Sequence, residues 1–511
     1  MNSANRRRFL RRAAVAGAIL LPGFPVTAAS GANPAGAVIT AEVNRTALLE
    51  GRCVVASAVA KSGAGAPLRG LRLRAFVNGK PWCASQTTLP SGVVHLLLPL
   101  PEPGHNVITV RGGGAISNPV SVEVKRRQYR IITDPKHLIG MEWETWFGPG
   151  YARWGQEEAE PVLGDYSSLD PRVLRQQTLW FNRMGINFVE LDWTNNLTKP
   201  FPDAPARECI AATNALFHLY THMRQHPRIV FMLGPEHNLF VNNHATAYTG
   251  PWFFQQLGYV YRHYVNNPKY RGLCLRYLGK PLLLLYLNGP NPNQPPPFKD
   301  PRFTIRWVSA WLQWTNGQRW GDWSWYDQRP TPTYSRGYVE ALTVTDGYMG
   351  HSPGPGLNPW LSLNAGGKNY GQTYRAQWRL ADRYRPRFLF LCQWNEFEPP
   401  DQYSVNLSND MEPTLIGGPG PKRQGWGFTY LNLTRREIGR YHRIIAALGP
   451  ARRSRGRDRR LHGLHGTPTR SHQGARNFWK TPGGTSRQRN GALLAGFEAT
   501  GEGAATRRVP G

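Results

Sequence analysis

The stretch FLFLCQWNEFEPPDQYSVNLSNDMEP, residues 388–413, joins a strongly apolar run to a group of acidic side chains. The run FLFLC has the length and character of a strand that is buried on both faces, as in a parallel sheet. It ends in Trp394, Asn395 and Glu396, and further acids follow at Glu398, Asp401, Asp410 and Glu412. A chain with a formal net charge of +30 therefore collects carboxylates beside one of its most apolar segments. This contrast predicts an acidic functional site at the end of a buried strand.

Seven more strand-like runs precede this one and alternate with helical patterns, which is typical of parallel strands with helical crossovers. They read HLIGMEWETWF, INFVELDW, RIVFMLG, PLLLLYLN, FTIRWVSAW, DWSWYD and ALTVTDGY. Eight strands are the number that closes a (β/α)8, or TIM, barrel. We therefore predict an α/β fold of the TIM barrel class over residues 135–449.

Two helices have clear sequence boundaries. The segment DPRVLRQQTLWFNRMG places Asp170 as the N-cap, Pro171 in the first turn and Gly185 at the end. A final helix is predicted to begin at Thr434, with Glu437 completing a capping box, and to end before residue 449.

Several predicted strands end in polar or aromatic residues. In a barrel of this type the carboxyl ends of the strands converge on one face, where active sites lie. We therefore predict that these strand-end residues surround a substrate; they are Trp143, Glu144, Asp192, Trp193, Glu236, His237, Tyr286, Tyr348, Trp394 and Asn395.

The segment 36–126 has a different pattern, in which short β-like runs are separated by Gly, Pro and Asn. These intervals predict a small β-sandwich of immunoglobulin type ahead of the barrel. The Asn-Gly pair in FVNGK favours a tight hairpin. Cys53 and Cys83 fall in this domain, and the sequence leaves open whether they form a disulfide or remain two core thiols.

The two ends of the chain have the composition of appendages. Residues 1–30 contain a positively charged head, a short apolar run and small residues, as in a cleaved signal peptide. The order Arg6, Arg7, Arg8, Phe9, Leu10, Arg11 resembles a twin-arginine export signal. We therefore expect the twin-arginine machinery to export the protein to the periplasm or the extracellular space. Residues 450–511 are rich in Arg, Gly and Ser, which predicts a basic disordered tail.

The remaining composition excludes some classes of function. No segment beyond the leader is apolar enough for a stable membrane span. The part of the chain between leader and tail is basic, but it has no helix-turn-helix or zinc-finger spacing, so we expect no nucleic-acid partner. No cysteine–histidine cluster indicates a structural metal.

Carboxylates grouped with Trp and Tyr rings are typical of enzymes that break glycosidic bonds. Such enzymes use two carboxyl groups, one that protonates the leaving oxygen and one that acts as base or nucleophile. Glu396 is the first candidate for a catalytic role, and Glu398 and Glu412 are the candidates for its partner.

Two motifs resemble glycoside hydrolase family 99, the endo-α-mannosidase type, and its relatives in family 71. The first is PVLGDYSSLDPRVLRQQTLWFNRMGINFVELDW, and the second is QWNEFEPPDQYSVNLSNDMEP, which contains the Trp-Asn-Glu signature. The resemblance spans about residues 138–448. It implies a barrel that hydrolyses glycosidic bonds in a polysaccharide or glycan, with no cofactor and no required metal. It also implies that Glu396 is a base acting on the sugar's own 2-hydroxyl.

The chain departs from that family at one catalytic position. The family's acid stands three residues after this Glu, where the present sequence has Pro399. The resemblance therefore leaves the acid unassigned between Glu398 and Glu412. The alternative interpretation is a carbohydrate-binding protein without catalytic activity, built on a degenerate hydrolase barrel.

Overall fold

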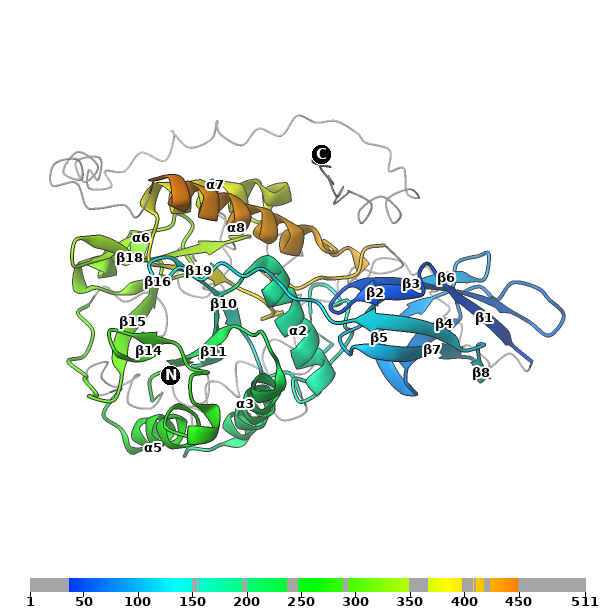
Figure 1. Cartoon of the computed structure of the whole chain (residues 1–511), viewed down its shortest axis with the longest axis horizontal. Helices are drawn as coiled ribbons and strands as arrows, with labels where there is room; N and C mark the ends of the chain where they lie inside the picture. The colour runs from blue at the N-terminus through cyan, green and yellow to red at the C-terminus, as the bar shows by residue number, and fades with distance from the viewer. Residues whose placement is uncertain are drawn as a thin grey trace, which may run out of the picture. The chain divides into compact units, whose positions relative to one another are not determined.

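The computed structural model describes residues 36–148, 154–155, 157–194, 200–236, 247–287, 293–348, 366–397, 408, 410–417 and 423–448. The predicted leader (1–30) and basic tail (450–511) lie outside these residues. The described chain is a mixed α/β structure with two small N-terminal sheets and one large, nearly closed sheet (Figure 1). The proposed division into domains at 126–135 stays a prediction.

The large sheet is built from the strands that the sequence predicts. They are β10 (Leu138–Trp143), β11 (Phe188–Trp193), β12 (Arg228–Leu233), β14 (Lys280–Tyr286), β15 (Thr304–Ala310), β16 (Trp323–Trp325), β18 (Tyr338–Thr345) and β19 (Phe388–Cys392). Their order across the sheet is β16-β15-β14-β12-β11-β10-β19-β18, and every neighbouring pair is parallel. Two short strands, β13 (Arg276–Tyr277) and β17 (Thr333–Ser335), add antiparallel pairs to β14 and β18.

The two ends of this sheet approach each other. The hydroxyl of Thr343 in β18 donates a hydrogen bond of 2.5 Å to the main-chain oxygen of Ser324 in β16. No ladder of main-chain hydrogen bonds joins these two strands within the described residues. The predicted barrel is therefore confirmed as a nearly closed sheet, while its eightfold closure stays a prediction.

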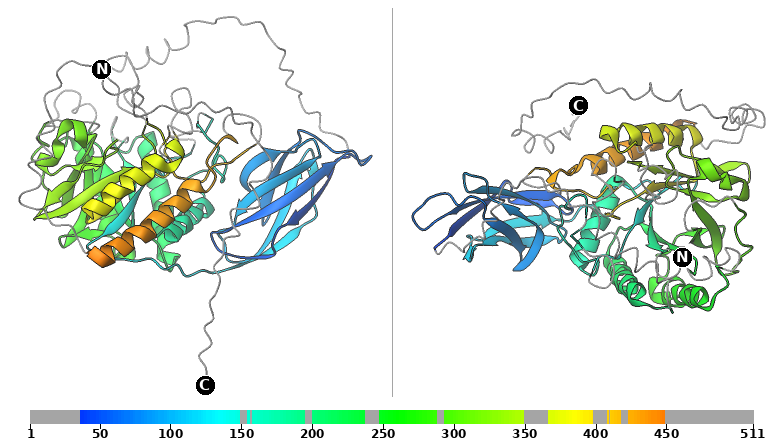
Figure 2. Two further views of the ribbon diagram at one scale, coloured as in Figure 1. Left: turned by 90° about the horizontal axis from the view of Figure 1, so that it is seen from above. Right: turned by 180° about the vertical axis from the view of Figure 1, so that it is seen from behind.

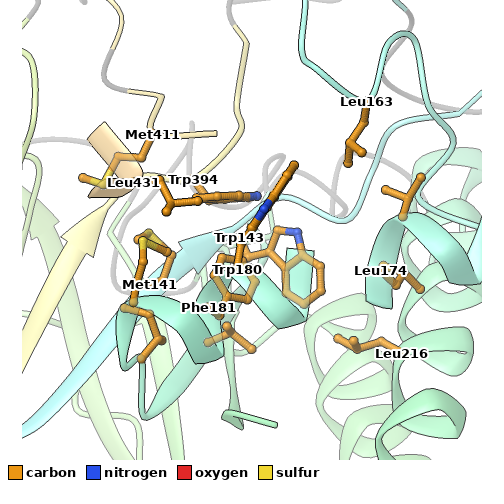
Figure 3. Packing of buried hydrophobic residues seen from close by; sticks show 14 of the residues in the cluster. Met141, Trp143, Leu163, Leu174, Trp180, Phe181, Leu216, Trp394, Met411 and Leu431 are labelled. Atoms are coloured by element: carbon orange, nitrogen blue, oxygen red, sulfur yellow. The ribbon is translucent and has the colours of Figure 1, made fainter. Parts of the chain in front are cut away.

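Each strand of the sheet has an inner and an outer face, because successive side chains point to opposite sides. The inner positions form one apolar cluster that includes Phe188, Met232, Leu284 and Phe390. The outer positions pack against helices, and Figure 3 shows Met141 and other residues in this layer. Both faces are thus buried, which explains why the strands read as continuous apolar runs.

The helices that cover the sheet include α2 (Pro171–Met184), α3 (Ala204–His222), α5 (Pro251–Val260), α7 (Gln372–Tyr384) and α8 (Thr429–Leu448). A π-helical turn, η2 (Tyr261–Val265), extends α5, and the shorter elements are η3 (Pro268–Tyr270), α6 (Leu312–Thr315), η4 (Gly317–Trp320) and η5 (Asn369–Gly371). The helices α7 and α8 run side by side (Figure 2), and the rings of Trp378 and Tyr441 meet at 6.0 Å between them. Among the described residues, no helix combines the length and apolar character needed to cross a bilayer.

The predicted boundaries of α2 are confirmed and the predicted start of α8 is wrong. The Asp170 side chain accepts a hydrogen bond from the main-chain N–H of Arg172, and Gly185 ends the helix with φ of 95°. Helix α8 begins at Thr429 rather than at Thr434. The Thr434 hydroxyl instead donates to the main-chain oxygen of Tyr430, one turn back inside the helix, at 2.8 Å. A Thr–Glu spacing within a helix therefore imitates a capping box.

The N-terminal sheets contain β1 (Val38–Val43), β2 (Ala47–Leu49), β3 (Cys53–Lys61), β4 (Arg72–Val77), β5 (Lys80–Thr87), β6 (Val93–Pro99), β7 (Gly104–Gly112), β8 (Ala115–Ile116) and β9 (Val120–Lys125). One sheet has the order β1-β3-β6, and the other has β2-β9-β7-β4-β5 with β8 beside β7. Asn78 and Gly79 have φ of 51° and 78° and form the predicted hairpin between β4 and β5. The immunoglobulin-type assignment itself stays a prediction.

Cys53 and Cys83 are both buried, and no disulfide joins them. Burial raises the pKa of the Cys83 thiol well above its usual value, and the neighbouring Cys53 adds to this effect. Of the two alternatives that the sequence left open, the structure therefore has two buried thiols and not a disulfide.

Gly140 provides a test of the packing inside the large sheet. A Cβ atom added at this position would lie 2.2 Å from the ring of Phe188. We expect Gly140→Ala to lower the free energy of unfolding by about 1–3 kcal/mol, because the ring or the strand must move. Denaturant unfolding measures this change. Gly366→Ala is the control, because a Cβ atom there meets nothing within 4 Å. Equal midpoints for the two variants would contradict the close approach.

Candidate functional site

Four carboxylates gather at the carboxyl end of β10 and β11. Glu142 and Glu190 are directly paired in the register of these strands, Asp192 lies two residues beyond Glu190, and Glu144 follows the end of β10. None of the four is more than 6% exposed. Carboxylate oxygens of Glu142, Glu144 and Asp192 all lie within 4.8 Å of one another. The strand ends thus concentrate acidic groups inside the sheet, as the sequence predicts for Glu144 and Asp192.

These carboxylates have few hydrogen-bond donors. The indole N–H of Trp325 donates to Oε1 of Glu142 at 2.6 Å, and the main-chain N–H of Thr194 donates to Oδ1 of Asp192 at 2.5 Å. Within the described residues, Glu142 Oε2, Glu144 Oε2 and Glu190 Oε1 accept no hydrogen bond. The ion pairs of the described chain do not include any of the four. Their negative charges are therefore poorly compensated when ionised.

Burial without compensating charge favours the protonated forms. Burial raises the pKa of Glu142 to about 8, and the neighbouring Asp192 adds to the shift. Burial also raises the pKa of Asp192, to about 6. For Glu144, burial and then the charges of Asp192, Glu142 and Glu396 raise the pKa well above its usual value. Burial therefore favours the protonated forms of Glu142 and Glu144, whereas Asp192 with a pKa of about 6 is mostly ionised at neutral pH.

Glu396 approaches this cluster from β19. Its main-chain N–H donates to Oδ1 of Asp410 at 2.5 Å, and the next N–H, of Phe397, donates to Oδ2 of Asp410 at 3.1 Å. The amide of Gln393 donates to the Glu396 carboxylate. Glu396 is partly exposed, unlike the four buried acids. Its charge contributes to the raised pKa of Glu144 and of Tyr286, so it lies near both.

Asn395 joins the strand ends that carry Glu144 and Glu396. Its side-chain oxygen accepts from the main-chain N–H of Glu144, and its side-chain N–H donates to the main-chain oxygen of Glu144, both at 3.0 Å. The same amide donates to the Tyr166 hydroxyl at 2.8 Å. Asn395 is fully buried. Asn395 therefore positions the main chain of Glu144, and its predicted contact with a substrate stays a prediction.

A buried polar network supports Asp410, which the sequence did not single out as a site residue. The Ser408 hydroxyl donates to Asp410 Oδ2 at 2.8 Å. The ammonium of Lys368 donates to the main-chain oxygen of Asp410 and to Oδ2 of Asp346, both at 2.6 Å. Glu158 forms a further side-chain hydrogen bond with Asp410. Lys368 lies far from Asp410 in the sequence, so no local pattern indicates this contact.

Glu412 does not lie where the sequence-based hypothesis requires. Tyr166 donates to its Oε2 at 2.7 Å, and Gln177 of α2 donates to its Oε1 at 3.1 Å. Burial raises the pKa of Glu412 to about 8. Both oxygens are thus occupied in the layer between sheet and helices. Glu412 thus holds the Tyr166 hydroxyl in place, and that hydroxyl in turn accepts a hydrogen bond from Asn395. This arrangement does not favour Glu412 as the catalytic acid.

Three predicted aromatic residues of the site face the helices instead. Trp143 meets Phe181 of α2 at 5.0 Å, and Trp394 meets the same ring at 4.9 Å (Figure 3). Trp193 meets Phe231 at 5.3 Å. All three tryptophans are fully buried in this outer layer. These positions do not fit the prediction that the three tryptophans stack on a substrate. Successive side chains of a strand point to opposite faces, so Trp143 and Trp193 point away from the acids beside them.

Two aromatic rings do lie beside the acids. Tyr286 of β14 and Trp325 of β16 meet edge to face at 5.3 Å. Burial raises the pKa of Tyr286, and the charges of Asp192, Glu142 and Glu396 add to the shift. Trp325 was not predicted, although its segment DWSWYD was assigned as a strand. Tyr348 stacks with Tyr326 at 5.7 Å in a separate buried cluster.

Glu236 has a structural partner. Its Oε2 accepts from the main-chain N–H groups of Trp252 and Phe253 at 3.1 and 3.3 Å, at the start of α5. A carboxylate is favourable at the N-terminus of a helix, where N–H groups lack partners. Glu236 therefore supports α5. His237 and Glu398 lie outside the described residues.

The residues that could hold a metal ion are Glu142, Glu144 and Asp192, because their oxygens are the ligand type of hard divalent cations. The same proximity lets carboxyl groups share protons. A cavity of about 10 Å³, about the size of one water molecule, lies beside this cluster. Its lining includes Glu142, Glu190 and Trp325. The geometry of the site is therefore compatible with proton chemistry and also offers three oxygen ligands to a cation.

Comparisons with family models and with curated proteins gave no match for this chain. Among solved structures, a GH99 endo-alpha-mannosidase from Bacteroides thetaiotaomicron is 13% identical, covers 62% of this chain and all of its own, and has a TM-score of 0.43. A glycoside hydrolase-like protein is also 13% identical and covers 61% of this chain and 96% of its own, with a TM-score of 0.40. A fragment of intimin bound to its receptor is 16% identical over 17% of this chain and 32% of its own, with a TM-score of 0.15. These values are too low to carry an argument about activity.

The raised pKa of Glu142 predicts a dependence of stability on pH. The folded state holds a proton that the unfolded chain releases near its ordinary pKa, so the free energy of unfolding should fall as pH rises from about 5 to about 8. We expect Glu142→Gln to flatten this slope by up to about 1.4 kcal/mol per pH unit. Thermal unfolding across this pH range measures the slope. Glu123→Gln, at an exposed position of β9, is the charge-matched control. The same slope in both variants would show that Glu142 is ionised when folded.

Proposed function

We propose that this protein hydrolyses glycosidic bonds in a polysaccharide or glycan at the carboxyl end of its parallel sheet. The observation that carries the proposal is the proximity of two unlike carboxyl groups. Glu396 is partly exposed, and its neighbour Asn395 is hydrogen-bonded to the main chain of Glu144, which is 1% exposed. Two carboxyl groups whose environments separate their pKa values are the machinery that this reaction needs.

In this proposal Glu144 is the general acid. Burial and then the charges of neighbouring acids raise its pKa well above the usual value, which favours the protonated form that a general acid needs. It gives this proton to the glycosidic oxygen as the bond between that oxygen and the anomeric carbon breaks. Glu144 thus supplies, from β10, the acid that the family 99 resemblance places three residues after Glu396, where this chain has Pro399.

Glu396 is the base in the same proposal. As a carboxylate it takes a proton from the water whose oxygen forms the new bond to the anomeric carbon. The resemblance to family 99 implies instead that the proton comes first from the sugar's 2-hydroxyl. In either case Asp410 and Gln393 hold Glu396 in place. The proton then returns from Glu396 to Glu144 through solvent.

Two aromatic residues complete the proposed site. Trp325 is partly exposed and donates its indole N–H to Glu142, so its ring is fixed beside the acids. A fixed ring can pack against the apolar face of a sugar. Tyr286 lies against it and faces Asp192, Glu142 and Glu396. We propose that this pair orients the sugar ring that is cleaved.

Reducing-end release from a panel of polysaccharides tests the proposal. We expect Glu396→Gln and Glu144→Gln each to lower kcat about 100-fold or more, because each removes one proton-transfer group. Glu144→Gln should also remove the alkaline limb of the pH profile of kcat/KM, which a merely structural change would leave in place. Glu123→Gln serves as the control on an exposed strand position.

The outcome that would contradict the hydrolase is binding without cleavage. If the wild-type protein retains glycans in affinity electrophoresis but releases no reducing ends, the non-catalytic carbohydrate-binding protein replaces the enzyme. Full activity of Glu144→Gln would show that the acid lies elsewhere.

We also propose that the protein acts outside the cytoplasm and that the small N-terminal sheets form an immunoglobulin-like spacer. The basis for export is the order of arginines at residues 6–8 ahead of an apolar run. We expect Arg6→Lys/Arg7→Lys to retain the protein in the cytoplasm of a host with a twin-arginine pathway, as measured by cell fractionation. Unchanged export of this variant would favour an ordinary secretion signal.

A further inference from the structure

A cavity of about 250 Å³ lies away from the acidic site, and four arginines and one histidine are among its twelve lining residues. The segment that leads into β10 contributes Arg126 and Arg127, α2 contributes Arg175, and the end of α3 with the residues after it contributes His222 and Arg224. One acid, Glu50, is among the lining residues. The cavity is of the size that encloses a single sugar or a small anion.

Most of the positive charge in this cavity is not neutralised by the described chain. Glu50 is already engaged, since Oε2 accepts from Arg175 at 2.9 Å and Oε1 accepts from the main-chain N–H of Arg127 at 3.0 Å. The ion pairs of the described residues do not include Arg126, Arg127 or Arg224. Three guanidinium groups are therefore available to an anion.

The wall of the cavity is fixed by hydrogen bonds. The side chain of Gln225 accepts from the main-chain N–H of Tyr129 and donates to the main-chain oxygen of Tyr129, both at 2.8 Å. Asn182 of α2 donates to the main-chain oxygen of Gln225 at 3.0 Å. The guanidinium of Arg127 lies over the Tyr129 ring at 5.2 Å. The arginines thus project from a wall that is already ordered before a ligand binds, which lowers the entropic cost of binding.

The cavity lies at the opposite end of the sheet from the carboxylates. Arg126 and Arg127 precede the start of β10, and Arg224 precedes the start of β12, whereas the acids stand at the carboxyl ends of β10 and β11. Because these strands are parallel, their starts share one edge of the sheet and their ends share the other. A ligand bound here would not compete with one at the acidic site.

We propose that this cavity binds the anionic group of an acidic sugar, such as the carboxylate of a uronic acid within a polysaccharide. The planar guanidinium presents paired N–H donors that match the two oxygens of a carboxylate. The inference does not rest on hydrolysis at the acidic site. The cavity would give a long polymer a second point of attachment to the protein. Attachment there raises the local concentration of the polymer at the acidic site.

The shape and composition of the cavity favour a sugar over nucleic acid. Proteins that bind single-stranded nucleic acid stack bases on exposed aromatic rings along a groove. The aromatic ring that lines this cavity, Tyr129, is buried and covered by Arg127. The concave wall instead offers charge and amide groups, which suit the carboxylate and hydroxyls of a single acidic residue.

Isothermal titration calorimetry on the full chain tests this site with four probes: a galacturonic acid hexamer, a neutral glucose hexamer, inorganic phosphate and a single-stranded thymidine oligomer. We expect the galacturonic acid hexamer to bind most tightly and to bind more weakly at about 0.5 M than at about 0.05 M salt. Arg126→Gln/Arg224→Gln should weaken it at least about tenfold. Arg436→Gln/Arg443→Gln removes the same charge from exposed positions of α8 and should leave the affinity unchanged.

Three alternative outcomes of the titrations would overturn the inference. Equal weakening by the two double variants would mean that only the net charge of the protein attracts the polymer. Phosphate binding as tightly as the hexamer would reduce the cavity to a general anion site, and tighter binding of the thymidine oligomer would make the partner a nucleic acid. Because reducing-end release is measured separately, failure of this site leaves the proposed hydrolysis untouched, and the reverse also holds.

Discussion

The reciprocal hydrogen bonds between Asn395 and the main chain of Glu144 are the constraint on which the acidic site depends. They continue the pairing of β10 with β19 beyond the point where both strands end, and the N–H of Trp394 bonded to the oxygen of Glu142 at 3.0 Å adds to it. Without this join, two irregular segments would carry Glu144 and Glu396 independently. With it, the two carboxyl groups are held on rigid strand ends, which is the arrangement that precise chemistry needs.

The electrostatics of the site depend on which carboxyl groups receive hydrogen bonds from the chain and which do not. Asp410, with Lys368 and Asp346 behind it, fixes the backbone of Glu396 but leaves that carboxyl group partly exposed. Glu142, Glu144 and Glu190 are buried, and each has one carboxylate oxygen that accepts no hydrogen bond from the described chain. The same fold thus places a partly exposed acid near buried acids. Burial raises the pKa of Glu142 and of Glu144 and favours their protonated forms.

The sequence predicted the strands of the large sheet because both of their faces are buried, which makes them continuous apolar runs. It predicted α2 because Asp170, Pro171 and Gly185 mark its ends by local chemistry. Glu142 and Trp143, like Asp192 and Trp193, must point to opposite sides of the sheet, but the sequence could not tell which side turns inward, because both faces of these strands are buried. Contacts between distant segments, such as Glu412 with Gln177 or Trp325 with Glu142, left no local signal. The sequence showed that acidic residues follow the strands, but the role of each acid depends on contacts with distant segments that the sequence does not show.

The protonation state of Glu144 at neutral pH decides whether this site can act as proposed. It is measured by a carbon-13 NMR titration of the glutamate side-chain carboxyl groups, in which the Glu144 resonance is assigned by its absence in Glu144→Gln. The raised pKa predicts that this resonance titrates well above the ordinary range of a glutamate. It further predicts that Glu396→Gln lowers the midpoint, because the charge of Glu396 contributes to the shift. A Glu144 resonance that titrates near the ordinary pKa of about 4.3 would show an ionised group and contradict its role as the acid.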